Sequence, residues 1–371
     1  MPFSSPIIIR MKTILALTLT SGLVAGYPSV TLAQTEVTDA VEAPAADVHP
    51  YQDIIDQARA LDAIETLIVA RDGEVVVEEG FHGHTTAETT NIKSASKSIV
   101  SALVGIAIEK GILEGVDQKI APILKDKLPE DPDPRLEEIT IGHLLSMQAG
   151  IGPTSGANYG RWIASRDWIA AALAQPFEDE PGGGMLYSTG STHLLSAILT
   201  RKGGKPTLEL AREWLKPVTG FRIGHWQRDR QGIYMGGNQM AMSPRSMLAF
   251  GELYRNRGKV GDVQVVPESW VEQSWTPRTR SIRNGDQYGY SWFITEMEGQ
   301  PVYYAWGFGG QMIYIAPEEE LTVVMTSDES RPSASNGYLG KLHKLMGNIV
   351  AAVASEAESA TEEKKNPAEK N

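Results

Sequence analysis

Hydrophobic positions along this chain follow helical spacing in the first part and β-type runs in the last third. Residues 51–60 carry apolar side chains at helical spacing. Residues 66–79 follow as two β-type segments joined by Arg71-Asp72-Gly73, a combination typical of a tight turn. This part of the chain therefore predicts a helix and then a β-hairpin.

A long apolar segment follows the hairpin. Residues 94–110 are almost wholly apolar after their first turn, and Gly111 comes next as a helix stop signal. Such a pattern predicts a helix that is buried on most sides. From about residue 111 to residue 211, further helical patterns are divided by loops rich in proline and glycine, so this region predicts helices without a strong strand.

The C-terminal third changes to short segments rich in β-branched and aromatic residues, which predict sequential antiparallel strands. These segments are residues 288–295, 302–308, 311–317 and 321–327. A last apolar segment, residues 339–354, predicts a helix. The whole order predicts an α/β (α+β) fold, in which terminal helices flank an antiparallel sheet and a helical subdomain is inserted.

The two ends of the chain differ from the part between them. Residues 1–33 combine two cations, a short apolar run and a small-residue end, which predicts a secretory signal; a membrane anchor or a buried helix is the alternative. No later apolar run is long enough to span a bilayer, so we expect no stable membrane span after signal removal. The predicted organisation is a signal peptide (1–33), a flexible tether (34–50), an α/β domain (51–98 and 216–354), a helical subdomain (99–215) and a disordered tail (355–371).

Composition narrows the chemistry. The formal net charge of −12 disfavours nucleic acid as a partner, because an acidic surface repels phosphates. The chain contains 0 Cys, which excludes disulfide scaffolds, thiolate nucleophiles and cysteine-rich zinc sites. Any nucleophile must therefore be an oxygen or a nitrogen.

The sharpest candidate is the pair Ser94 and Lys97, three positions apart at the start of the buried helix. That spacing places both side chains on one helical face, so the amine can reach the hydroxyl. A serine becomes a good nucleophile only when a base takes its proton, and burial keeps a lysine neutral enough to act as that base. The alternative is a helix cap followed by a solvated lysine.

Two further segments could complete a site. Residues 187–190 (Tyr-Ser-Thr-Gly) precede a helical pattern, and a tyrosine at such a junction can point into a cleft and relay a proton. Residues 306–311 (Trp-Gly-Phe-Gly-Gly-Gln) lead into a strand, where glycines allow a main-chain N–H to approach a substrate oxyanion. Taken alone, these segments are also compatible with ordinary packing and a turn.

In this order and at these separations, the three segments resemble the serine β-lactamase and penicillin-binding protein superfamily. More narrowly, they resemble its class C-like branch, with family VIII esterases and 6-aminohexanoate-dimer hydrolases. The resemblance covers roughly residues 51–354 and implies a β-lactamase-like fold. It also implies that Ser94 is the nucleophile, Lys97 its base and Tyr187 a proton relay, with an oxyanion held by the backbone N–H groups of Ser94 and Gln311. No cofactor and no metal is expected.

Two positions depart from the superfamily pattern. Thr189 stands where the tyrosine motif usually has Asn, and Phe308 stands where β-lactamases and peptidases carry Lys or His. Because a phenyl ring cannot pair with a carboxylate, we expect neutral or apolar esters and amides rather than penicillins or D-Ala-D-Ala peptides. The substrate-binding residues expected around the site are Tyr159, Thr189, Trp306, Phe308, Gly309 and Gly310, and Tyr303 and Tyr304 could add to an apolar wall.

The sequence thus predicts an exported, periplasmic serine hydrolase (esterase or amidase) that acts on a small-molecule ester or amide through a Ser94 acyl-enzyme. One alternative is a β-lactamase or D,D-peptidase. Another is a binding protein on the same fold that has lost turnover. Histidines offer little support for other chemistry: His82 and His84 lack a third metal ligand nearby, and His193 lacks the nucleophile elbow of a Ser-His-Asp hydrolase.

Overall fold

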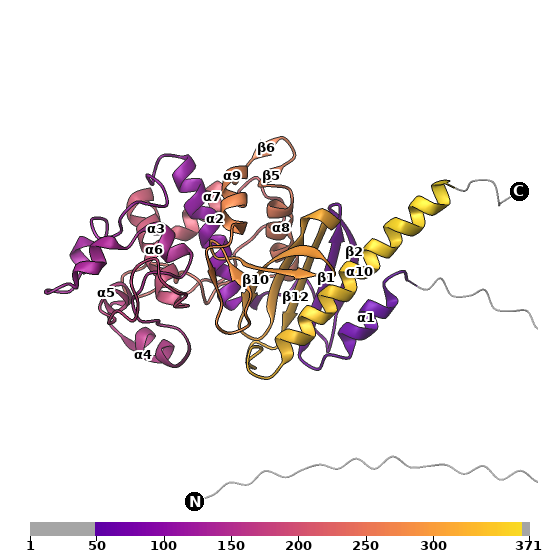
Figure 1. The fold of residues 1–371 in the computed structure, drawn as a ribbon, viewed down its shortest axis with the longest axis horizontal. Helices are drawn as coiled ribbons and strands as arrows, with labels where there is room; N and C mark the ends of the chain where they lie inside the picture. The colour runs from indigo at the N-terminus through magenta and orange to yellow at the C-terminus, as the bar shows by residue number, and fades with distance from the viewer. Residues whose placement is uncertain (1–48, 366–371) are drawn as a thin grey trace, which may run out of the picture. The chain divides into compact units, whose positions relative to one another are not determined.

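An eight-stranded antiparallel sheet forms the centre of the computed structural model, which describes residues 49–365 and their side chains as far as residue 356 (Figure 1). The predicted signal peptide and residues 34–48 of the predicted tether lie outside the described residues. The strand order is β2-β1-β12-β11-β10-β9-β8-β7. The strands are β1 (Ile64–Arg71), β2 (Glu74–Gly80), β7 (Thr279–Arg280), β8 (Gln287–Tyr288), β9 (Phe293–Met297), β10 (Gln300–Gly307), β11 (Gln311–Ala316) and β12 (Leu321–Ser327).

The predicted N-terminal hairpin is present as β1 and β2. Arg71 pairs with Glu74 across the turn. The two residues between them, Asp72 and Gly73, both have positive φ, as a type I′ hairpin turn requires. β1 then pairs with β12 on its other side, so the first and the last strand of the chain are neighbours in the sheet.

Three of the four predicted C-terminal strands are confirmed, and the fourth is corrected. Residues 288–295 form the end of β8 and the start of β9, and residues 289–292 between them are not a strand. The carbonyl of Ser291 accepts a hydrogen bond from Ser98 Oγ, and that of Tyr290 accepts one from Ser101 Oγ. Tertiary hydrogen bonds to the helix of residues 96–109 therefore replace sheet pairing here, which the apolar pattern alone could not show.

Side chains of the central strands alternate between two hydrophobic cores. Ile68, Ile313 and Val324 lie in the core shared with the helical region, whereas Val69 and Tyr314 lie in the core under the terminal helices. α1 (Gln52–Arg59) and α10 (Tyr338–Lys365) cover this second face, and α8 (Pro244–Arg255) packs on the other face against β11 and β12 (Figure 1). The terminal helices therefore flank the sheet, as predicted, and α8 covers its other face.

The middle of the chain is helical, with α2 (Ser96–Glu109) buried along most of its length. The boundary predicted between residues 98 and 99 falls inside α2, and the division into a sheet domain and a helical subdomain stays a prediction. The remaining helices are α3 (Ile141–Leu145), α4 (Tyr159–Ala164), α5 (Trp168–Leu173), α6 (Thr189–Gly203), α7 (Thr207–Trp214) and α9 (Glu268–Trp275). Short strands β3 (Thr90–Asn91), β4 (Ala241–Met242), β5 (Lys259–Val260) and β6 (Val263–Gln264) pair locally.

The predicted disordered tail is wrong for residues 355–365, which continue α10. Glu356 anchors this part of the helix because its carboxylate accepts a hydrogen bond from Tyr51 Oη at 2.7 Å and pairs with Arg71 at 3.2 Å. Both partners are distant in sequence, so the composition of the tail gave no sign of them. Residues 366–371 lie outside the described residues.

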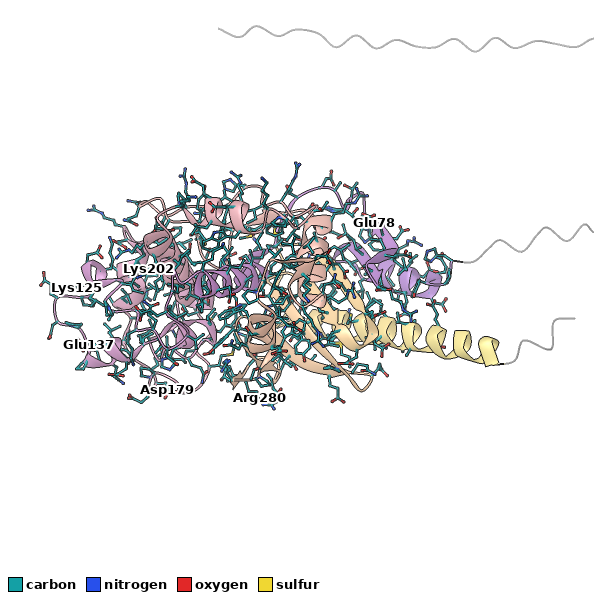
Figure 2. All side chains as sticks on the ribbon, turned by 90° about the horizontal axis from the view of Figure 1, so that it is seen from above. Glu78, Lys125, Glu137, Asp179, Lys202 and Arg280 are labelled. Atoms are coloured by element: carbon teal, nitrogen blue, oxygen red, sulfur yellow. The ribbon has the colours of Figure 1, made fainter. Side chains whose placement is uncertain are left out.

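Charged side chains such as Lys125, Glu137 and Lys202 are exposed and project from the surface in Figure 2. Within residues 49–365, no helix combines the length and the apolar character needed to cross a membrane.

Candidate active site

Ser94 lies in a 3-10 turn, Lys93–Ala95, that leads directly into α2. The preceding residue, Lys93, has φ +49°, an unusual value for a residue with a Cβ. Asn91 Oδ1 accepts a hydrogen bond from Lys93 N at 3.1 Å and supports this conformation. Ser94 itself is partly exposed and lies at the mouth of the buried helix.

Lys97 lies one turn further on and is 1% exposed. Its Nζ is 3.1 Å from Ser94 Oγ, 3.4 Å from Thr189 Oγ1 and 2.7 Å from the carbonyl oxygen of Gly237. A neutral amine has two hydrogens and one lone pair. Two of these three oxygens can accept the hydrogens, which leaves the lone pair for the proton of Ser94.

The surroundings of Lys97 also favour the neutral form. Burial lowers its pKa from 10.5 to about 7, because the interior penalises the ammonium ion. No carboxylate is among the hydrogen-bond partners of Nζ, all of which are neutral oxygens. The lysine is therefore able to accept a proton near neutral pH.

Tyr187 lies immediately before the N-cap of α6, where the sequence predicted a loop-to-helix junction. Lys97 Nζ lies 5.0 Å from the centroid of its ring. Burial raises the pKa of Tyr187 to about 12, although a hydrogen bond to Ser94 and the charge of Arg283 oppose that rise. The phenol therefore stays protonated near neutral pH, and the structure brings it together with Ser94 and Lys97.

Thr189 occupies the first turn of α6 and contacts the lysine directly. Its Oγ1 is 3.0 Å from Ser155 Oγ, and its N–H donates to the same hydroxyl at 2.8 Å. These bonds tie the loop after α3 to the start of α6. Thr189 thus reaches Lys97 despite being shorter than the expected Asn.

The Gly237 carbonyl is a site group that the sequence interpretation missed. A Cβ at Gly237 would lie 2.6 Å from Lys97 Cγ, and one at Gly236 would lie 2.0 Å from the carbonyl oxygen of Thr192. Contacts this close exclude any side chain, so only glycine allows the backbone to pack onto Lys97 and α6. Two adjacent glycines were the available signal, but their partner was not visible in the sequence.

The third segment forms the turn between β10 and β11. Gly307 pairs with Gln311 across this turn, and a Cβ at Gly307 would lie 2.2 Å from the carbonyl oxygen of Ile92. The segment therefore packs against the turn that holds Ser94. The Gln311 side chain is buried and donates to the carbonyl of Ser327, so any contact that Gln311 makes with a substrate involves its backbone.

A family model described as Beta-lactamase matches residues 59–345, well over half of the chain. The chain belongs to the beta-lactamase family. The expected superfamily is therefore confirmed, and so is the fold. No curated protein sequence matches the chain.

Solved structures of other beta-lactamase-fold proteins are similar over most of the chain. One, provisionally assigned as a 6-aminohexanoate-dimer hydrolase from Bacillus anthracis, is 22% identical with a TM-score of 0.66, and 83% of this chain and 82% of that chain are covered. A family VIII carboxylesterase is 16% identical with a TM-score of 0.62, covering 80% of this chain and 96% of that chain. An octameric penicillin-binding protein homologue from Pyrococcus abyssi is 18% identical with a TM-score of 0.63, covering 81% and 77%. At these identities, the likeness shows the fold.

Gly309 and Gly310, in the turn between β10 and β11, pack closely against neighbouring segments. Gly309 and Gly310 have φ of +91° and +109°. A Cβ at Gly309 would lie 2.7 Å from the carbonyl oxygen of Asp328, and one at Gly310 would lie 2.8 Å from Leu342 Cδ1 of α10. Their nearest neighbours are therefore the residue that follows β12 and a leucine of α10, and their expected role in substrate binding stays a prediction.

Tyr159 lies beside the Gly237 loop. Its Oη contacts Met235 Sδ at 3.4 Å, and its ring packs on Trp162 at 6.0 Å. Burial raises the pKa of this phenol, while hydrogen bonds to Gln239 and Asn238 lower it. Tyr159 is thus close to the loop that contacts Lys97.

The aromatic residues of β10 and of the turn after it lie in different environments. Trp306 is partly buried and donates from Nε1 to Ser333 Oγ at 3.1 Å, whereas Phe308 is 49% exposed at the turn. Tyr304 is fully buried and bonded to Asp286, so the expectation that it lines a substrate wall is wrong. The strand alternation points it into the core under α10. Tyr303 stacks on Trp275 at 4.1 Å.

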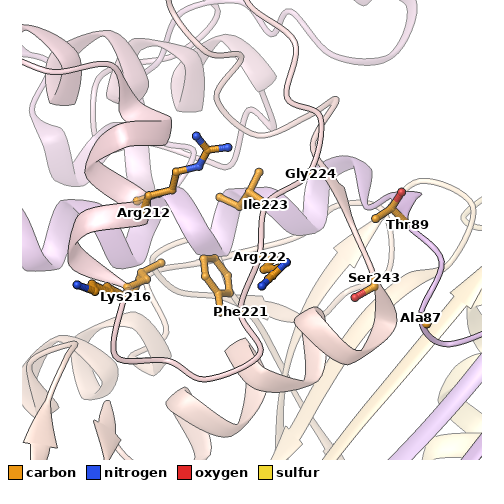
Figure 3. A pocket seen from close by; sticks show the side chains of 11 residues that line it. Ala87, Thr89, Arg212, Lys216, Phe221, Arg222, Ile223, Gly224 and Ser243 are labelled. Carbon is orange, nitrogen blue, oxygen red and sulfur yellow. The ribbon is translucent and has the colours of Figure 1, made fainter.

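One cavity lies away from these residues. It has a volume of about 640 Å³ and is lined by residues that include Arg212, Phe221 and Arg222 (Figure 3). None of its lining residues belongs to the Ser94 cluster, so we place the candidate site on the side-chain geometry rather than on cavity size. Among the described residues, no group of three or more potential ligands could hold a metal ion.

Proposed function

We propose that this beta-lactamase-family chain is a serine hydrolase that cleaves an ester or amide through a Ser94 acyl-enzyme. The observation that carries the proposal is the buried amine of Lys97, whose Nζ is 3.1 Å from Ser94 Oγ and whose pKa is lowered to about 7. A lysine in this state can take the serine proton at neutral pH.

In the acylation step, Ser94 Oγ attacks the carbonyl carbon of the substrate while its proton passes to Lys97 Nζ. The carbonyl oxygen becomes an oxyanion, which we assign to the backbone N–H groups of Ser94 and Gln311. Each such donor contributes about 3 kcal/mol of transition-state stabilisation. When the bond to the leaving group breaks, the leaving group takes a proton from Tyr187, and Lys97 returns its proton to the phenol.

In the deacylation step, water attacks the acyl carbon and the same groups act in reverse. A phenol with a pKa raised to about 12 is a weak acid, so Tyr187 accepts the water proton only as it passes its own proton to Lys97. The proton then returns to Ser94 Oγ as the acyl group leaves as a carboxylic acid. This cycle uses no cofactor.

Phe308 supports a substrate without an essential carboxylate. It is 49% exposed, so a phenyl ring is presented where related enzymes place a cation. An apolar rim favours a neutral acyl or leaving group. Tyr159, beside the loop that contacts Lys97, and Trp306 are our proposed further contacts for that group.

The test is covalent labelling with a fluorophosphonate, followed by intact-mass analysis. We expect one adduct, on the Ser94 peptide, in the wild-type protein and none in Ser94→Ala. We also expect Lys97→Ala to acylate at least about a hundredfold more slowly. Folded wild-type protein that does not label would instead support the non-catalytic binding protein.

One observation favours a second candidate, a β-lactamase or D,D-peptidase. The charge of Arg283, between β7 and β8, lowers the pKa of Tyr187, and a Cβ at Gly156 would lie 3.6 Å from Arg283 Nη2. A cation near the phenol could hold a substrate carboxylate. Turnover of a chromogenic cephalosporin as fast as a short p-nitrophenyl ester, lost in Arg283→Gln, would support this candidate.

Export to the periplasm is part of the proposal. It rests on the charged start, the short apolar run and the small-residue end of residues 1–33. Detection of a mature chain that begins at Gln34 in a periplasmic fraction would test it.

A further inference from the structure

His193 and Asp229 form a buried pair that the proposed reaction does not use. His193 lies on α6 with its side chain fully buried, and its Nε2 is 3.2 Å from Asp229 Oδ2, which is also fully buried. The rings of Trp162 and Trp168 pack edge-on against the imidazole, with centroids 5.6 and 5.5 Å away. A buried carboxylate is costly unless its hydrogen bonds are satisfied, so this pair calls for a physical reason.

The other nitrogen of the imidazole contacts the backbone near the site. Gly236 N–H donates to His193 Nδ1 at 3.4 Å. Because Nδ1 must offer a lone pair to this donor, the hydrogen of a neutral ring lies on Nε2 and points to Asp229. One imidazole therefore links a buried carboxylate to the Gly236 backbone.

Asp229 holds the other end of the same loop. Its Oδ1 accepts hydrogen bonds from Gln231 N at 2.9 Å and from Ile233 N at 2.8 Å, while Oδ2 faces His193. Both ends of residues 229–236 are thus fixed by one carboxylate and one imidazole. Neither ring nitrogen of His193 faces a hydroxyl, so the pair is not part of a Ser-His-Asp triad.

The residue after Gly236 contacts the proposed base. Gly237 O accepts from Lys97 Nζ at 2.7 Å, which is the shortest of the three contacts made by that amine. The direction of the lone pair on Lys97 Nζ depends on which oxygens accept the two hydrogens of the neutral amine. A shift of Gly237 O would therefore turn the lone pair away from Ser94.

We propose that His193 and Asp229 are positioning residues that fix the Gly236-Gly237 turn, and through the Gly237 carbonyl orient Lys97 toward Ser94. This inference rests on the proposed function, because it requires Lys97 to act as the base for Ser94. It assigns no chemistry to His193 itself. It explains why α6 carries a histidine where an apolar residue would pack at lower cost.

The test compares variants of the full chain by their rate of fluorophosphonate acylation. His193→Phe keeps a ring but removes both hydrogen bonds, and we expect its maximal acylation rate to fall about tenfold or more, with apparent probe affinity changed less than about threefold. His193→Asn can place an amide oxygen where Nδ1 was. We expect it to recover a large part of the lost rate.

The matched control is His343→Phe. His343 is a partly buried histidine, close to an aspartate and bonded to Tyr314 Oη at 3.2 Å, but it lies on α10. A general loss of stability would affect both variants alike, whereas we expect the acylation rate of His343→Phe to stay within about twofold of wild type. Equal losses in the two histidine variants would overturn the proposal.

Asp229→Asn provides a second route if His193→Phe does not fold. If its amide oxygen faces the two backbone N–H groups, its NH₂ faces His193 Nε2 and forces the hydrogen onto Nδ1, against Gly236 N–H. If the amide turns, its NH₂ faces those two backbone donors. We expect a slower rate in either orientation, and a wild-type rate would overturn the proposal.

Failure of this inference is distinguishable from failure of the proposed function. Wild-type protein that does not label at Ser94 would remove both. Labelling at Ser94 with an unchanged rate in folded His193→Phe would remove only the positioning role.

Discussion

At the scale of single residues, the site depends on one lysine kept out of water. Lys97 is 1% exposed, and its hydrogen-bond partners are neutral oxygens from three other parts of the chain. Burial lowers its pKa to about 7, so the amine titrates near neutral pH. In the proposed reaction, the pH dependence of acylation therefore follows the titration of this residue.

We expect the acylation rate with a neutral p-nitrophenyl ester to rise with pH and to level off above an apparent pKa near 7. Below that pH, Lys97 is an ammonium ion and cannot accept the Ser94 proton. Tyr187, whose pKa is raised to about 12, adds no loss of rate below about pH 10. Stopped-flow burst rates between pH 5 and 10 measure this profile, and a flat profile across pH 6–8 would contradict the assignment.

At the scale of elements, the turn between β10 and β11 is shaped by close packing against α10. Gly310 has φ +109°, and a Cβ there would lie 2.8 Å from Leu342 Cδ1 and 3.0 Å from Tyr338 Cε1. Gly337 also has positive φ, but nothing lies within 4 Å of its Cβ position. Alanine substitutions at these two glycines therefore separate the cost of a left-handed backbone from the cost of a steric clash.

We expect Gly337→Ala to lower the free energy of unfolding by about 1 kcal/mol, which is the cost of left-handed backbone with a Cβ. Gly310→Ala should cost about 2 kcal/mol more, because the added methyl also overpacks the β12 and α10 layer. Urea unfolding of both variants measures the difference. Equal midpoints would show that α10 moves away without cost.

At the scale of the whole molecule, the surface charge acts on substrates before they reach the site. The formal net charge is −12, so an anionic substrate is repelled at long range and a neutral substrate is not. Salt screens this repulsion, with a Debye length of about 30 Å at 0.01 M and about 8 Å at 0.15 M.

We therefore expect kcat/KM for an ester that carries a carboxylate to rise about threefold between roughly 10 and 300 mM salt. The matched neutral ester, with a methyl group in place of the carboxylate, should change by less than about 1.5-fold. A mono-p-nitrophenyl succinate and p-nitrophenyl butyrate form such a pair. A fall in rate for the anion would instead indicate that a local cation such as Arg283 dominates its binding.

The sequence by itself determined the order of elements and the three segments of the candidate site. Helical spacing, the Asp-Gly turn and the β-branched strands are local patterns, and local patterns are set by residues close in sequence. The Ser94 and Lys97 pair was visible for the same reason, since three positions on a helix place two side chains on one face. Their approach to Tyr187 was inferred from a family resemblance rather than from spacing.

Only the tertiary structure decided the contacts made between distant segments. The Gly237 carbonyl on Lys97, the bond between His193 and Gly236, the break at residues 289–292 and the extension of α10 past Glu356 all join parts of the chain far apart in sequence. Such contacts depend on which partners the buried polar groups find after the helices and strands pack. The helical or strand spacing of apolar residues does not encode these partners.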